Sequence, residues 1–129
     1  RNLLPGELER WTDIDHAREI AVIALASVHG IEQELGDVRC VRDDADARVC
    51  DFAIVIGDEW QHHGLGRMLL RRLMRSAADA GVEVLSGITL STNFPMLALA
   101  RKLGFQASRE AGDATVTRLE IRLEHPGDT

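Results

Sequence analysis

The sequence contains no tyrosine, only 4% aromatic residues and just two cysteines, Cys40 and Cys50. Two cysteines are too few for a disulfide framework, and their spacing does not suit a metal site, so we expect reduced thiols in the core. No apolar run is long enough to span a membrane, and no secretory leader is recognisable. These absences lead us to expect a cytoplasmic protein that does not bind membranes.

Basic residues are also in the minority, and the chain carries a net charge of −6. This charge argues against nonspecific binding of nucleic acid, which depends on basic patches, and favours a cationic substrate weakly. With 129 residues, 45% of them hydrophobic, the chain is long enough for one domain and too short for two. We therefore expect a single domain over residues 1–129, with residues 125–129 as a loose tail.

Apolar patterning indicates both strands and helices, and so predicts an α/β (α+β) fold. Alternating residues indicate strands, and the first three of them are expected to form an antiparallel meander. Apolar residues at three- and four-residue spacings indicate two longer helices. In chain order, we expect a helix from Pro5 to Trp11, strands at 18–27, 31–41 and 49–57, a helix at 64–80, a strand at 82–90, a helix at 93–104 capped by Asn93, and a strand at 115–124 that closes the sheet.

Two glycines, Gly64 and Gly66, stand between a predicted strand and the start of a predicted helix. Such a turn allows close approach of the backbone and leaves several N–H groups without intrahelical partners, so it can receive an anion. A tight turn with no ligand is the alternative. The dinucleotide fingerprint needs a third glycine where Leu69 stands, and the triphosphate loop needs a Gly-Lys-Ser/Thr sequence that is absent.

The string "QHHGLG" resembles the Q/R-x-x-G-x-G/A signature of the GNAT acetyltransferases, and "NFPMLALARKLGF" resembles the second half of their cofactor region. Both regions are most similar to the acetyltransferase domains of bacterial protein-lysine acetyltransferases, which modify a lysine of acyl-CoA synthetases. The resemblance implies a GNAT fold, in which helices flank a mixed, mostly antiparallel central sheet, and it implies acetyl-CoA as co-substrate. It implies no metal, and the adjacent histidines His62 and His63 do not have the spacing of metal ligands.

The resemblance also implies which residues hold acetyl-CoA. The loop would bind the pyrophosphate, the strand before it would align the pantetheine by backbone pairing, and the second helix would contribute two residues. The implied cofactor-binding residues are Ile54, Val55, Ile56, Gln61, His62, His63, Gly64, Leu65, Gly66, Arg67, Asn93 and Met96.

For catalysis, the resemblance places the general base at Asp51, where relatives carry a glutamate, and an oxyanion donor at the backbone N–H of Val55. Aspartate is shorter by one C–C bond, about 1.5 Å, which favours relay of the proton through a water. Many family members use a tyrosine to protonate the leaving thiolate, but Ala100 stands at that position. A thiol with a pKa of about 8.5 leaves readily without an acid, so we expect water to protonate it.

We therefore expect transfer of an acetyl group to a primary amine in a ternary complex, most directly to a protein lysine, with an acyl-CoA synthetase as the implied partner. A small amine such as a polyamine, attracted by Asp43, Asp44 and Asp46, is one alternative. A noncatalytic acyl-CoA-binding sensor is another.

GNAT domains usually begin with a strand and a helix that would precede Arg1. We expect both to be missing here, which would leave the strand near residues 19–27 as an open edge. Open edges recruit partners, so this strand is expected to pair in a homodimer or with a preceding segment of the intact protein.

Overall fold

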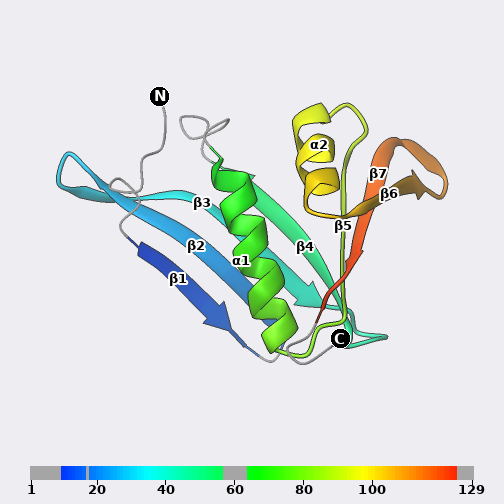
Figure 1. Cartoon of the computed structure of the whole chain (residues 1–129), viewed down its shortest axis with the longest axis horizontal. Coiled ribbons are helices and arrows are strands. Elements are labelled where there is room, and N and C mark those ends of the chain that lie inside the picture. Colours follow the sequence, from blue (N-terminus) through cyan, green and yellow to red (C-terminus); the bar gives the residue numbers. More distant parts are fainter. Residues whose placement is uncertain (1–9, 17, 57–63, 125–129) are drawn as a thin grey trace.

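The fold is built on one seven-stranded sheet with the strand order β1-β2-β3-β4-β5-β7-β6 (Figure 1). The structure, a computed structural model, describes residues 10–16, 18–56 and 64–124. All neighbouring strands are antiparallel except β4 and β5. The strands are β1 (Arg10–Asp15), β2 (Glu19–Val28), β3 (Ile31–Arg42), β4 (Val49–Ile56), β5 (Val84–Leu90), β6 (Gln106–Glu110) and β7 (Asp113–Arg122). The mixed, mostly antiparallel sheet and the meander of β2, β3 and β4 confirm the predicted fold class.

The two helices that the apolar spacing predicted pack on one face of this sheet. Helix α1 (Leu65–Asp79) crosses β2, β3 and β4 in Figure 1, and α2 (Phe94–Lys102) lies beside it, toward β5 and β7. Alternate residues of the strands meet the apolar side of α1 in the core. Its largest fully buried members include Ile20, Val22, Leu35, Val38, Leu65, Leu69, Leu70, Leu73, Leu85 and Leu119.

The parallel strands β4 and β5 separate soon after they meet. Their pairing covers three residue pairs, from Val49–Val84 to Asp51–Ser86, although both strands continue beyond them. At this point the ring of Phe52 lies against Gly87, where an added Cβ would be 2.8 Å from Phe52 Cε1 and 2.9 Å from its carbonyl oxygen. A side chain at position 87 would therefore force the two strands apart at the place where the sheet opens.

The N-terminal expectation was wrong in two respects. Arg10–Asp15 is a strand, not the end of a helix, and it pairs with β2 from Asp15–Ile20 to Arg10–Leu25. The expected open edge at residues 19–27 is therefore covered within the chain, which removes the argument for a homodimer through that strand. A strand also precedes Glu19, although the usual first strand was expected to be missing. Tertiary pairing outweighs local helix propensity here.

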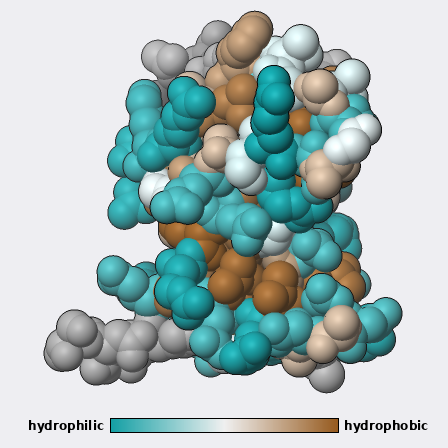
Figure 2. Space-filling view, turned by 90° about the vertical axis from the view of Figure 1, so that its right-hand side faces the viewer, coloured by the Kyte–Doolittle hydropathy of each residue, from teal (hydrophilic) through white to brown (hydrophobic). Residues whose placement is uncertain are grey.

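The strand β6 was not predicted, and it displaces β7 from the edge of the sheet. Its sequence, "QASRE", is almost wholly exposed and has no apolar alternation. The strand forms because it pairs with β7, from Gln106–Glu120 to Glu110–Asp113. The side of the molecule that carries this hairpin is mostly hydrophilic, with separate apolar patches (Figure 2).

The two cysteines are free and fully buried, as expected for core thiols. A hydrogen bond with Cys50, together with burial, raises the pKa of the Cys40 thiol. Cys40 is therefore a packing residue rather than a nucleophile. In the described part of the chain, neither helix has the length and apolar character needed to cross a membrane.

Arg72 of α1 fastens the edge strand β1 to the helix. Its guanidinium lies 4.8 Å from the ring centre of Trp11, and its Nη2 lies 3.3 Å from Asp13 Oδ2. We expect Arg72→Met to lower the free energy of unfolding by about 1 kcal/mol, because a cation–π contact and a half-exposed ion pair are lost together. Chemical denaturation measures this change. Arg75→Met, on an exposed position of the same helix, is the matched control, and an equal effect of both variants would contradict the assignment.

Candidate functional site

The first turn of α1 forms one wall of the candidate site. Gly64 caps the helix with φ = 81°, a left-handed conformation that disfavours other residues. The first helical bond is donated by Met68 N–H to the Gly64 carbonyl, at 3.2 Å. Residues 65–67 therefore present N–H groups without intrahelical acceptors, and no side chain caps them and no acidic residue stands in the first turn. This end of the helix attracts an anion.

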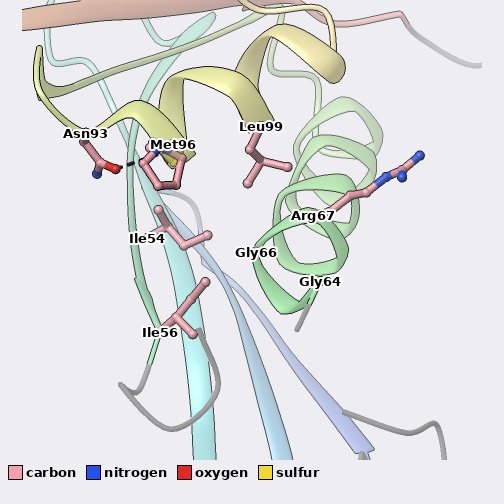
Figure 3. Close-up of a pocket in the computed structure, with 9 residues that line it drawn as sticks. Ile54, Ile56, Gly64, Gly66, Arg67, Asn93, Met96 and Leu99 are labelled. Atoms are coloured by element: carbon pink, nitrogen blue, oxygen red, sulfur yellow. Dashed lines mark hydrogen bonds between the residues drawn. The ribbon is translucent and has the colours of Figure 1, made fainter. Parts of the chain in front are cut away.

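A cavity of about 330 Å³ lies beside this turn, between β4 and the two helices. Ile54 and Ile56 extend from β4 toward α1 and α2 in Figure 3. Gly66 allows close packing of α1 against this cavity, because an added Cβ would lie 3.1 Å from Ile56 Cδ1 and 3.2 Å from Leu99 Cδ2. The full lining is Ile54, Ile56, Gly64, Gly66, Arg67, Asn93, Pro95, Met96 and Leu99.

Asn93 fixes the opposite wall at the start of α2. Its Oδ1 accepts a hydrogen bond from Met96 N–H at 3.2 Å (Figure 3). Its Nδ2 donates to Thr89 Oγ1 at 3.2 Å. The predicted cap is confirmed. Because the cap ties the helix start to the end of β5, it holds Met96 over the cavity.

Seven of the implied cofactor-binding residues meet at this cavity, namely Ile54, Ile56, Gly64, Gly66, Arg67, Asn93 and Met96. Leu65 is buried in the core, so only its backbone faces the helix start. Gln61, His62 and His63 lie outside the described residues. Pro95 and Leu99 also line the cavity but were missed; Leu99 lies three residues after Met96, a spacing that could have revealed it.

The structure does not place Asp51 and Val55 in this cavity. Both are exposed, and strand alternation turns them to the face of β4 opposite Ile54. A smaller pocket of about 160 Å³ lies where β4 and β5 separate, and it shares Ile54, Asn93 and Met96 with the main cavity. This pocket is also lined by Ala53, which is on the same face of β4 as Asp51, and by Ile88, which is on the same face of β5 as Ser86. Ser86 is the residue of β5 that pairs with Asp51. The opening in the sheet thus reaches both faces.

A charged network lies next to Asp51 in the sheet. Ser86, the register partner of Asp51, is buried and accepts a hydrogen bond of 2.7 Å from Arg118 Nη1. Arg118 also pairs with Glu110, and that hydrogen bond, with the charges of Glu110, Asp51 and Glu120, raises the pKa of the guanidinium. A permanent positive charge therefore stands near Asp51. Among the described residues, no three His, Cys, Asp or Glu side chains gather as a metal site.

These features agree with the comparisons to known proteins. Residues 5–106 match the Acetyltransferase (GNAT) domain family, so the chain belongs to the GNAT acetyltransferases. The resemblance noted in the sequence is thereby confirmed at the level of the family.

Two relatives and one solved structure illustrate the similarity. The chain is 30% identical over 111 residues to Acetyltransferase PA5475 of Pseudomonas aeruginosa, covering 86% of this chain and 59% of that protein. It is 26% identical over 114 residues to Acetyltransferase Pat of Mycolicibacterium smegmatis, covering 88% and 34%. The fold matches yncA of Salmonella typhimurium, a structure with acetyl-CoA, at a TM-score of 0.69 and 20% identity, covering 82% and 65%. The chain thus spans only part of each protein.

Gly64→Ala tests the role of the helix start. A Cβ at Gly64 meets no atom within 4 Å, so the substitution mainly strains the backbone at φ = 81°. We expect a loss of about 1 kcal/mol of stability and weaker binding of acetyl-CoA in calorimetry, because the N–H groups shift. Gly112→Ala is matched in φ (79°) and in open space but lies in the β6–β7 turn. Equal acetyl-CoA affinity in both variants would show that Gly64 is not part of the acetyl-CoA site.

Proposed function

We propose that this chain transfers an acetyl group from acetyl-CoA to a primary amine, most directly the side chain of a protein lysine. The observation that carries the proposal is the uncapped start of α1 beside an apolar cavity that continues into the opening between β4 and β5. The resemblance to bacterial protein-lysine acetyltransferases favours a lysine of an acyl-CoA synthetase as the acceptor.

The residues of the cavity fit acetyl-CoA. The N–H groups of residues 65–67 suit its pyrophosphate, with Gln61, His62 and His63 as the proposed remainder of that loop. Beyond Asp51, β4 is no longer paired with β5, so the edge of Phe52–Ile56 can pair with the amides of pantetheine. Ile54, Ile56 and Met96 cover its apolar segments.

The acceptor must lose a proton before it attacks. A free lysine amine has a pKa of about 10.4, so about one in 2,500 is neutral at pH 7, a cost of roughly 4.6 kcal/mol. A positioned base typically raises the rate by about 10² to 10⁴, which is comparable to the factor lost because the amine is protonated. Asp51 is the proposed base: it stands at the last paired position before the opening and is exposed on the face away from both helices.

The proposed steps use few groups. Asp51 accepts a proton from the amine, directly or through water, while the nitrogen bonds to the thioester carbonyl carbon. The resemblance assigns the N–H of Val55 to stabilise the oxygen on which charge develops, whereas in the structure the backbone of Val55 faces Gly36 of β3. The C–S bond then breaks and the thiolate takes a proton from water. Ala100, buried in α2, has no proton to give.

The alternative acceptors gain less support. The acidic turn that could attract a polyamine is engaged locally: Asp44 pairs with Arg18, and Asp46 pairs with Arg48 at 3.0 Å. A noncatalytic sensor would also use the cavity, so only turnover separates it from an enzyme.

Asp51→Asn tests the base. We expect a fall in kcat of about 10² to 10⁴ with an unchanged KM for acetyl-CoA, because the variant removes the proton acceptor and leaves the cavity intact. Steady-state assays with lysine peptides measure both constants. Asp79→Asn, an exposed carboxylate at the end of α1, is the control with the same change in net charge.

Equal kcat values for Asp51→Asn and the native chain would refute the base assignment. Binding of acetyl-CoA without turnover on any lysine peptide or small amine would instead favour the sensor. Turnover on polyamines but not on peptides would show that the acceptor is a small amine, and the proposed acetyl transfer would still hold.

A further inference from the structure

We propose that Ser86 is a positioning residue for the acetyl transfer: its hydroxyl holds a water between the acceptor amine and Asp51, and the proton passes to Asp51 through that water. This inference rests on the proposed function and deepens it. It names the side chain that lets a short carboxylate act on an amine that it does not touch.

Ser86 lies in β5 directly beside the proposed base. It is the register partner of Asp51 in the last of the three pairs that join β4 to β5, so both residues stand at the edge of the opening in the sheet. Of the buried residues that the structure describes, Ser86 alone carries an oxygen or nitrogen atom in its side chain. A buried hydroxyl destabilises the fold unless it is hydrogen-bonded, so its partners matter.

The hydrogen bonds of Ser86 leave one hydrogen to be donated. Arg118 Nη1 donates to Ser86 Oγ at 2.7 Å, and a guanidinium cannot accept, so Ser86 is the acceptor of this bond. The hydroxyl still has its own hydrogen, which forms no hydrogen bond to any residue that the structure describes. Because Arg118 is charged and is also bonded to Glu110, it holds the Ser86 oxygen in place and makes the hydroxyl a stronger donor.

Asp51 is the anionic group next to that hydroxyl. Register partners carry their side chains on the same face of a sheet, and neighbouring strands lie about 4.8 Å apart. The two side chains are not directly hydrogen-bonded to each other, so a bridging water suits the space between them. Asp51 is exposed, which gives water and an amine access to it.

The relay balances its protons. The nitrogen of the amine bonds to the thioester carbonyl carbon as its N–H proton passes to the water, and the water gives one of its own hydrogens to Asp51. Water is regenerated, and Ser86 keeps its proton while it donates to the water oxygen. A glutamate would reach about 1.5 Å further, one C–C bond, and could take the proton directly. Ser86 should therefore matter only while residue 51 is an aspartate.

Ser86→Ala tests this dependence in two backgrounds, the native chain and Asp51→Glu. Single-turnover rates with a lysine peptide are the measurement, because product release does not limit them. We expect Ser86→Ala to lower the rate about 10-fold in the native chain, the effect of one hydrogen bond, and to leave it unchanged in the Asp51→Glu background. The KM for acetyl-CoA should not change. Ser108→Ala, at the exposed register partner of Arg118 in β6, is the matched control and should keep the native rate.

An equal fall in both backgrounds would show that Ser86 only supports the fold, and an unchanged rate in the native chain would show that it has no role. Either result would overturn this inference and leave the base assignment standing. If Asp51→Glu is inactive, the rate of the native chain in mixtures of light and heavy water decides instead. A curved dependence on the deuterium fraction indicates two moving protons and supports the relay, whereas a linear one overturns it. If Asp51→Asn keeps the native kcat, the proposed base fails and the relay fails with it.

Discussion

The short parallel contact between β4 and β5 is the constraint on which the site depends. Phe52 packs so closely on Gly87 that the strands touch there, and its ring also lies 5.5 Å from that of Phe105, beyond the end of α2. The strands diverge beyond this contact, and the opening becomes the smaller pocket. If pairing continued along both strands, the edge of β4 would be used within the sheet, and an extended ligand would have no backbone to bind.

Charge is distributed unevenly around this opening. The chain is acidic as a whole, yet the basic side chains of Arg67, Arg71 and Lys102 line a groove where α1 meets α2. On the other face, Asp51, Glu110 and Glu120 surround Arg118. An anionic co-substrate and a cationic acceptor would each meet a face of opposite charge. The net charge of −6 describes neither face, which is why it indicated a substrate only weakly.

The sequence predicted elements whose signals are local. Helix α1 and helix α2 follow from apolar spacing, and their starts follow from Gly64 and Asn93, whose roles depend on a few neighbouring residues. The strands β1 and β6 depend on partners: Trp11 packs under Arg72 of a distant helix, and β6 has no pattern apart from its pairing with β7. Local propensity cannot supply such information.

The same distinction applies to the site. The glycines and the capping asparagine were predicted from the sequence because each acts on the neighbouring backbone, and short sequence motifs reveal such roles. The position of Asp51 beside Ser86 required the register of β4 and β5, and the groove at Lys102 required the packing of two helices. Gln61, His62 and His63 remain predictions, as they lie outside the described residues.

Strand alternation in β4 has a consequence for how such a domain can diversify. Ile54 and Ile56 face the helices, whereas Asp51, Ala53 and Val55 face away. Substitutions at every second position would therefore alter one face and spare the other. A change of acceptor would therefore need substitutions on one face of β4 only, while the residues proposed to hold acetyl-CoA lie on the other.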